Sequence, residues 1–172
     1  MYLDVIKIRY AQIRELDISN GSGIGVSLFV QGCPFHCKNC FNIQTWEYND
    51  GNVWDINTKN KFLNIIDKMY VVRVSLLGGE PLYFNNVIGI LELCKDIKSK
   101  YPDIYIWIWT GFKYEDLKDE QLEVLKYTDV LVDGQYIEEL KDFSLKFKGS
   151  SNQRIIDVQR SLQQNKIILY DC

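Results

Sequence analysis

The stretch IGVSLFV (residues 24–30) leads directly into GCPFHCKNCFN (residues 32–42), and these two segments set how the chain is organised. The first is almost continuously apolar, which is typical of a strand buried inside a parallel sheet. The second holds three of the five cysteines and the only histidine. Ligands within one short loop can reach a common centre at little cost in chain entropy, so this loop is the candidate site.

The cysteines of this loop, Cys33, Cys37 and Cys40, have the spacing C-x-x-x-C-x-x-C. Thiolates are soft ligands that suit iron–sulfur clusters and zinc. A structural zinc site needs a fourth ligand, and only His36 is near, at a position where reaching the same metal would strain the loop. Three thiolates on a four-iron cluster instead leave one iron open for a substrate or cofactor. A disulfide framework is disfavoured by the odd cysteine count and the ligand-like spacing.

Apolar runs predict three further strands after residues 24–30, and these cover residues 71–77, 104–109 and 129–132. Weaker patterns predict an edge strand or hairpin within residues 1–18, a long irregular loop over residues 43–56, and short strands over residues 154–158 and 167–170.

Helical patterns separate these strands. Asn57 and Thr58 can cap a helix with Phe62, Ile66 and Met69 on one face. A second helix opens at Asn85 and Asn86, and a third covers residues 114–125. Alternating strands and helices predict an α/β fold with a right-handed parallel sheet, open or curled into a partial barrel.

Each of the four strands ends in a polar or glycine-containing motif. In chain order these are the cysteine loop, Gly78-Gly79-Glu80, Thr110-Gly111 and Asp133-Gly134-Gln135. Parallel sheets build their sites at the carboxyl ends of their strands, so we expect the four motifs to converge on one rim.

These motifs also have purely structural explanations. Gly78 and Gly79 allow a ligand close to the backbone and Glu80 can accept hydrogen bonds from an ammonium group, but the same residues suit a strand-to-helix turn. Thr110 fits a cap equally well. Asp133 and Gln135 likewise suit either a ligand contact or a purely structural role. Phe41 and Trp46 suit packing or contact with a ligand, and for Phe41 its place beside Cys40 favours contact. Cys94 fits an apolar helix stripe, and Cys172 has no assigned role.

The chain's length and composition indicate one ordinary globular domain. It has 172 residues, of which 47% are hydrophobic and 25% charged, with a net charge of -3. Scattered basic residues and the negative charge argue against a nucleic-acid surface. Apolar runs are too short to cross a membrane and the start has no secretory pattern, so we expect a cytoplasmic protein.

The cysteine spacing resembles the signature of the radical S-adenosylmethionine (SAM) enzymes. The longer string SLFVQGCP (residues 27–34), continued by CFN (residues 40–42) and Thr45-Trp46, resembles the family that activates anaerobic ribonucleoside-triphosphate reductases. The string SSNQRIIDV (residues 150–158), which contains Arg154, is also typical of that family. The resemblance extends from about residue 17 to residue 158.

This resemblance implies a radical SAM domain over residues 1–172, with a partial parallel (β/α) barrel. It implies that Cys33, Cys37 and Cys40 hold a [4Fe-4S] cluster and that SAM binds its open iron. The positions at which similar enzymes contact SAM are Asn39, Cys40, Phe41, Gly78, Gly79, Glu80, Thr110, Asp133 and Gln135. An electron from a reductant such as flavodoxin would cleave SAM to methionine and a 5'-deoxyadenosyl radical. That radical would take a hydrogen atom from a glycine of the large reductase subunit.

Two positions depart from the pattern. Many glycyl-radical activases have an arginine two residues after a Gly-Pro-Gly turn, but here Gly25 follows Gly21-Ser22-Gly23. This puts in doubt any ion pair that the arginine makes. Asn39 stands where the wider superfamily has an aromatic residue before the third cysteine. Two alternatives stay open, namely an activase of another enzyme such as pyruvate formate-lyase and a non-catalytic zinc or cluster-binding module.

Overall fold

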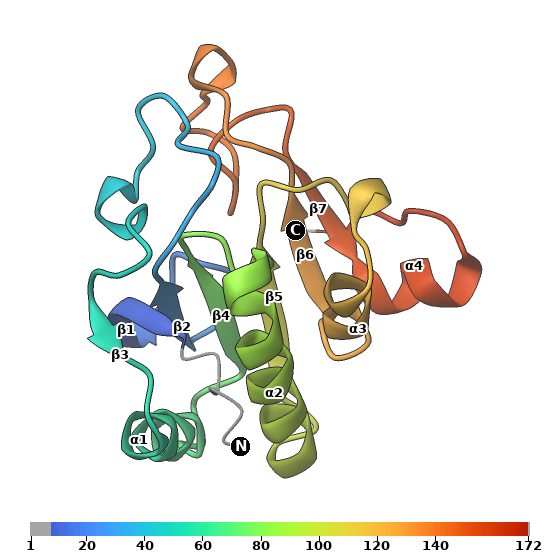
Figure 1. The fold of residues 1–172 in the computed structure, drawn as a ribbon. Helices are drawn as coiled ribbons and strands as arrows, with labels where there is room; N and C mark the ends of the chain where they lie inside the picture. Colours follow the sequence, from blue (N-terminus) through green and yellow to red (C-terminus); the bar gives the residue numbers. More distant parts are fainter. Residues whose placement is uncertain (1–7, 172) are drawn as a thin grey trace.

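A seven-stranded mixed sheet forms the centre of the molecule, with strand order β3-β1-β2-β4-β5-β6-β7 (Figure 1). The computed structural model describes residues 8–171. The middle of the sheet consists of four parallel strands, which are β2 (Gly25–Val30), β4 (Arg73–Gly78), β5 (Tyr105–Trp109) and β6 (Val130–Asp133). These are the four strands that the apolar runs predicted, and their parallel pairing is confirmed.

Antiparallel strands flank this parallel centre. Strand β1 (Arg9–Asp17) pairs with β2, and the two-residue strand β3 (Asn52–Val53) pairs with β1. On the other side β7 (Arg154–Asp157) pairs with β6. The strand predicted within residues 1–18 is therefore β1, although residues 1–7 lie outside the described part. The sheet runs from β3 at one edge to β7 at the other, so it is mixed and a barrel is not confirmed.

Helices α1 (Ile56–Ile66), α2 (Phe84–Lys100) and α3 (Glu120–Leu125) follow β3, β4 and β5 and lie on one side of the sheet (Figure 1). The main core fills the space between these helices and the sheet. Its members are buried side chains from both layers, including Leu28, Phe62, Leu76, Ile90, Ile108 and Val124. Within residues 8–171, no helix combines the length and the apolar character needed to span a bilayer.

Several helix predictions need correction. The cap of α1 is Asp55, whose carboxylate accepts a hydrogen bond from Thr58 N at 2.7 Å, in place of the predicted Asn57-Thr58. Met69 lies beyond α1 and is 99% exposed, so it is not on the apolar face. The helix predicted over residues 114–125 is divided into a 3₁₀ turn (Tyr114–Asp116) and α3, because Asp119 between them has φ of 47°.

Two further differences concern segments with weak patterns. The predicted loop over residues 43–56 contains a 3₁₀ turn (Ile43–Thr45) as well as β3. Helix α4 (Val158–Gln164) begins where the strand predicted over residues 154–158 ends, and the predicted last strand is reduced to one bridge between Leu169 and Ile156.

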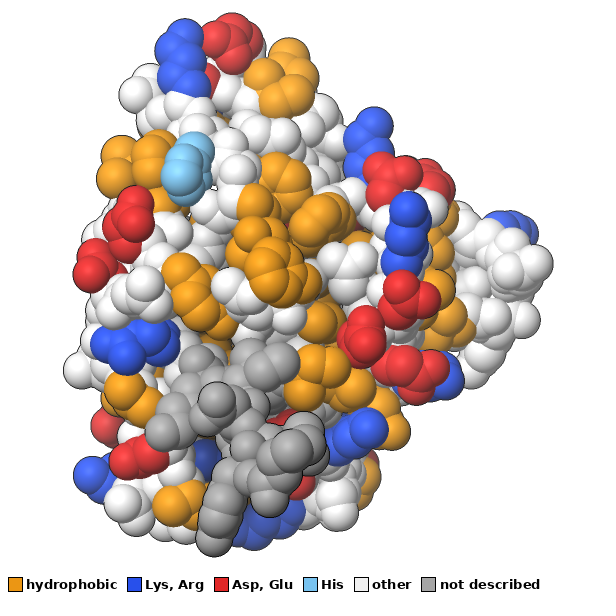
Figure 2. Space-filling model, in the orientation of Figure 1, with side chains coloured by type: hydrophobic (Ala, Val, Ile, Leu, Met, Phe, Trp, Pro, Cys, Tyr) orange, Lys and Arg blue, Asp and Glu red, His pale blue; other side chains and the backbone are white. Residues whose placement is uncertain are grey.

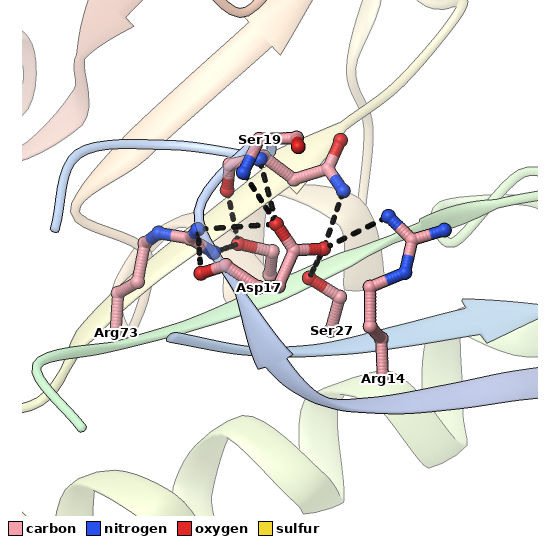
Figure 3. Close-up of polar contacts among 7 residues, drawn as sticks. Arg14, Asp17, Ser19, Ser27 and Arg73 are labelled. Atoms are coloured by element: carbon pink, nitrogen blue, oxygen red, sulfur yellow. Dashed lines mark hydrogen bonds and ion pairs between the residues drawn. The ribbon is translucent and has the colours of Figure 1, made fainter. Parts of the chain in front are cut away.

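A buried ion pair lies on the face of the sheet opposite α1, α2 and α3 (Figure 3). The side chains of Asp17 and Arg73 both have no exposed surface, and Arg73 Nη2 donates to the Asp17 carbonyl at 2.7 Å and contacts its carboxylate at 3.4 Å. Arg73 lies opposite Gly25 in register, and a Cβ on Gly25 would be 2.4 Å from Arg73 Cγ. The guanidinium therefore occupies the space that a side chain at position 25 would need.

Charged side chains are dispersed on the face shown in Figure 2, where Lys and Arg alternate with Asp and Glu.

Candidate functional site

A pocket of about 630 Å³ opens at the carboxyl ends of the parallel strands. Three of the four predicted motifs meet there, and the fourth contributes Gly134. The lining residues from these motifs are Cys33, Cys37, Cys40, Phe41, Gly78, Gly79, Glu80, Thr110 and Gly111. The parallel topology thus brings segments 30 to 100 residues apart in the sequence to one cavity.

The cysteine loop is fixed to its neighbours by backbone hydrogen bonds at its start. Gly32 N donates to Thr45 O at 2.8 Å and Cys33 N donates to Trp46 O at 3.1 Å. On the other side, Glu80 N donates to Gly32 O at 2.8 Å. The loop therefore enters the pocket between the 3₁₀ turn and the end of β4, and Cys33 starts from a fixed backbone position.

The arrangement of donors suits a cluster better than zinc. Among residues 8–171, no three His, Cys, Asp or Glu side chains are close enough to hold a single metal ion, whereas structural zinc needs four ligands around one point. In a four-iron cluster each thiolate binds a different iron, so three thiols spread over one pocket wall fit it. The His36 ring instead stacks on Trp46, with centroids 4.5 Å apart.

Cys33 and Cys37 lie in surroundings that disfavour a bare thiolate. Burial raises the pKa of Cys33 to about 11, and the negative charge of Glu80 acts in the same direction. Burial also raises the pKa of Cys37. Such thiols keep their protons until a metal displaces them, so cluster binding would supply the positive charge that stabilises the thiolates.

Glu80 connects the ends of β4 and β5. It is 1% exposed, and its carboxylate accepts hydrogen bonds from Leu82 N at 2.9 Å, Thr110 Oγ1 at 2.8 Å and Gly111 N at 2.7 Å. Burial raises the pKa of Glu80 to about 7, although these three donors act against that rise. Glu80 and Thr110 thus have a structural role as well as a place in the pocket wall.

The two glycines before Glu80 allow close contacts that no other residue would permit. Gly78 has φ of 107°, and a Cβ there would lie 2.7 Å from Phe29 Cα. A Cβ on Gly79 would lie 2.5 Å from Gly32 O. The backbone after β4 can therefore lie against the cysteine loop, where Gly79 N donates to Val30 O at 2.8 Å.

Three predicted site residues lie outside the pocket lining, namely Asn39, Asp133 and Gln135. Asn39 adopts a left-handed conformation with φ of 56°, and Gln135 is exposed directly after β6 and Gly134. Asp133 is 1% exposed and forms an ion pair with Arg154.

Arg154, whose role the sequence did not reveal, holds three elements together. Its Nε donates to Asp133 at 3.0 Å, and its two terminal nitrogens donate to Glu115 at 2.9 and 2.7 Å. Asp133 also accepts a hydrogen bond from Tyr114 N at 2.8 Å. Arg154 therefore joins β7 to the end of β6 and to the 3₁₀ turn after β5.

Sequence reasoning missed a group of pocket residues on the face opposite the main core. Phe29, Leu77 and Trp109 line the pocket, as do Arg14 and Phe147. A usable signal was present, because side chains alternate along a strand. Leu28 and Leu76 face the helices, so their paired neighbours Phe29 and Leu77 had to face the other side.

The fold and this pocket define a class of protein, and similarity to known proteins identifies that class. The family model described as a 4Fe-4S single cluster domain matches residues 19–156, so the chain belongs to that class. A curated relative from Enterobacteria phage T4 is 40% identical over 86% of this chain and 93% of its own length. A relative from Escherichia coli (strain K12) is 39% identical over 85% of this chain and 96% of its own, and one from Vibrio cholerae is 37% identical over 86% and 97%. All three are named anaerobic ribonucleoside-triphosphate reductase-activating protein. The chain belongs to this family of activating proteins.

Proposed function

We propose that this chain is an enzyme that activates an anaerobic ribonucleoside-triphosphate reductase by generating its glycyl radical. The observation that carries the proposal is that all three thiols of the C-x-x-x-C-x-x-C loop line the same pocket as the glycine backbone after β4. A chain of this family with such a pocket has the parts needed to hold a cluster beside a small organic cofactor. The relatives' names favour the reductase over pyruvate formate-lyase as the target.

Cys33, Cys37 and Cys40 would hold a [4Fe-4S] cluster, with SAM as the second cofactor. When bound, the reduced cluster and SAM together supply one-electron cleavage to methionine and a 5'-deoxyadenosyl radical, which abstracts the glycine hydrogen atom. Binding of SAM next to the cluster is supported by Gly78 and Gly79, which line the same pocket as the cysteines and have no side chains to block a ligand.

The side chains around these glycines would orient the cofactor. Phe41 and Thr110 border the pocket, and the Thr110 hydroxyl is held in place by its hydrogen bond to the Glu80 carboxylate. Asn39, Asp133 and Gln135 would act from the margin, by shaping the cysteine loop and the loop after β6. The four parallel strands, with helices on one face and the pocket on the other side, would correspond to a partial (β/α) barrel of the radical SAM type in a single domain over residues 1–172.

Radical transfer requires geometry and exclusion of water more than proton transfer. The pocket agrees with this requirement, because its only fully buried carboxylate, Glu80, already accepts three protein hydrogen bonds and Phe29, Leu77 and Trp109 give it an apolar wall. The reductase segment that carries the glycine would complete the enclosure.

The electron would come from a small reductant such as flavodoxin. A cytoplasmic location is supported by the requirement of the cluster for reduced thiols.

The decisive test is anaerobic reconstitution with iron and sulfide, followed by chemical reduction in the presence of SAM and chromatography for methionine and 5'-deoxyadenosine. We expect both products, and with the reductase added we expect the electron paramagnetic resonance signal of a glycyl radical. Absence of both products from a reduced, fully assembled cluster, with the reductase present, would refute the proposal. Zinc in place of about four irons would support the non-catalytic alternative.

A further inference from the structure

The pocket extends along the sheet, away from the cysteines, to a polar region made of Arg14, Ser19 and Asn20. Arg14 lies on β1 opposite Ser27 of β2. Ser27 is three residues before the end of β2, so this region is about 10 Å from the strand ends at which the cysteine loop begins. None of the residues proposed above to hold the cluster or SAM belongs to this region.

Arg14 is held in place but retains unused donors. Its guanidinium carbon lies 4.9 Å from the centroid of the Phe29 ring, and its Nη1 donates to Asp17 Oδ2 at 3.3 Å. No hydrogen bond among residues 8–171 involves its Nε or Nη2, and Figure 3 shows these nitrogens turned away from Asp17. The side chain is 40% exposed, so a ligand in the pocket can reach these donors.

The acidic groups around Arg14 do not fully neutralise its positive charge. Among residues 8–171, Asp17 is its one acidic partner, and the same carboxylate also faces Arg73 and accepts hydrogen bonds from Ser19 N, Asn20 and Ser27. Two arginines therefore share one carboxylate. The group carries one net positive charge, and Arg14 is the member that lines the pocket.

The rest of the lining does not neutralise this charge. Its other charged residues are Glu80, Asp142 and Lys148. Glu80 is buried with three donors, Asp142 accepts hydrogen bonds from Ser144, and Lys148 donates to Gln153 O at 2.9 Å. Phe29, Leu77 and Trp109 separate these groups from the polar region by an apolar surface. A complementary occupant has an apolar body and one carboxylate.

We propose that Arg14 recognises an acidic side chain in the reductase segment that carries the target glycine, and so helps to determine which segment enters the pocket. This inference rests on the proposed function. A guanidinium already oriented by stacking and by Asp17 binds a carboxylate with little loss of side-chain entropy. The pair lies away from the cysteines, so it orients the segment without entering the chemistry.

The test separates binding of the reductase from cleavage of SAM. Arg14→Gln removes the charge, Arg14→Lys keeps it, and Arg14→Glu reverses it. Arg160→Gln is the matched control, because Arg160 lies on α4 outside the pocket lining and its side chain is 55% exposed. For each reconstituted variant we would measure cluster content, 5'-deoxyadenosine formed without the reductase, and the dissociation constant of the complex with the reductase.

Loss of a charge-assisted contact weakens binding about tenfold. We expect the dissociation constant to rise about tenfold for Arg14→Gln and further for Arg14→Glu, with a smaller rise for Arg14→Lys, which keeps the charge but not the stacked guanidinium, and with Arg160→Gln near wild type. Cluster content and SAM cleavage should stay unchanged. Neutralising the contacted acidic residue of the reductase should weaken binding to the wild-type chain but not to the Arg14→Gln variant. This comparison of reductase variants stays valid even if the Arg14 variants are less stable.

Two results would overturn the inference alone. One is an unchanged dissociation constant for Arg14→Gln while the wild type still activates the reductase. The other is a raised KM for SAM with unchanged affinity for the reductase, which would assign Arg14 to the cofactor. If the wild type itself yields no 5'-deoxyadenosine with the reductase present, the proposed function fails and this inference fails with it.

Discussion

Replacing Asp17 with asparagine tests the ion pair beneath the pocket. The Asp17 carboxylate accepts hydrogen bonds from Ser19 N at 2.7 Å, Ser27 Oγ at 2.8 Å and Asn20 Nδ2 at 2.7 Å, besides its contacts with two arginines. Every group around it is a donor. Asn offers one acceptor oxygen and turns its amide hydrogens toward donors, and it leaves the fully buried Arg73 without a counter-charge.

The expected magnitude follows from that burial. Breaking a buried pair by removing one partner costs about 3–5 kcal/mol, because an uncompensated charge stays behind. In a domain of this size each kcal/mol corresponds to about 2–4 °C, so Asp17→Asn should lower the melting temperature by roughly 10 °C. The double variant Asp17→Asn with Arg73→Met removes the stranded charge, and we expect it to lose less stability than Asp17→Asn alone.

The effect of pH gives a second, independent check. Burial acts to raise the pKa of Asp17, but hydrogen bonds from Ser27, Asn20 and Ser19 outweigh burial and lower it to about 2. A depressed folded-state pKa stabilises the protein above the ordinary pKa, and this contribution is lost as the pH falls from about 4 to about 2. The shift corresponds to about 2 kcal/mol. The stability difference between wild type and Asp17→Asn should therefore narrow by that amount over this range.

Urea denaturation of the reconstituted protein, followed by circular dichroism under anaerobic conditions, measures these differences. Asn20→Ala is a suitable control, because it removes one hydrogen bond to Asp17 without stranding a charge. A loss below about 1 kcal/mol for Asp17→Asn at pH 7, or a double variant as unstable as the sum of the single ones, would refute the argument from a buried counter-charge.

Three further predictions concern close contacts and ligands. Gly25→Ala should lower the free energy of unfolding by about 2 kcal/mol, because its Cβ would lie 2.4 Å from Arg73 Cγ. Gly25→Arg combined with Arg73→Gly should regain most of that stability. If the double variant loses as much stability as Gly25→Ala, the two strands cannot exchange the arginine. Gly79→Ala places a Cβ 2.5 Å from Gly32 O, so iron and sulfide analysis should show reduced cluster assembly in a chain that still folds. Cys37→Ala should abolish 5'-deoxyadenosine formation in the reconstituted enzyme, and retained cleavage would exclude Cys37 as a ligand.

The sequence was sufficient for the parallel centre of the fold because its signals are local. The run over residues 24–30 is apolar except at Ser27, and the structure buries β2 along its whole length, as it does β6. The location of the site motifs could be predicted from the parallel strands, since a motif that follows a parallel strand lies at the carboxyl edge of the sheet. Cys33 and Gly78 could thus be assigned to one rim before any contact between them was known.

The failures depended on strand pairing between segments distant in sequence and on backbone conformations that the apolar pattern does not encode. Nothing local distinguishes β7 as antiparallel, because its direction is set by pairing with β6 and by the Arg154 contacts to Asp133 and Glu115. The helix predicted over residues 114–125 has a continuous apolar pattern, yet the backbone at Asp119 has a positive φ that interrupts it. The alternation of strands and helices left an open sheet and a partial barrel both possible, and the resemblance favoured the barrel, but edge pairing is a property of the whole sheet.

Position 25 shows how such distant pairing can preserve an interaction that the sequence seems to have lost. The missing arginine after the Gly21-Ser22-Gly23 turn put the associated ion pair in doubt, because a sequence read strand by strand offers no substitute nearby. The register of β2 and β4 sets Arg73 directly opposite Gly25, and the guanidinium reaches Asp17 across the absent side chain. In this chain β4 supplies the buried guanidinium beside that carboxylate, and Gly25 of β2 leaves the space for it. Because Gly25 and Arg73 depend on each other in this way, we expect a substitution at either position to be tolerated only with a matching change at the other.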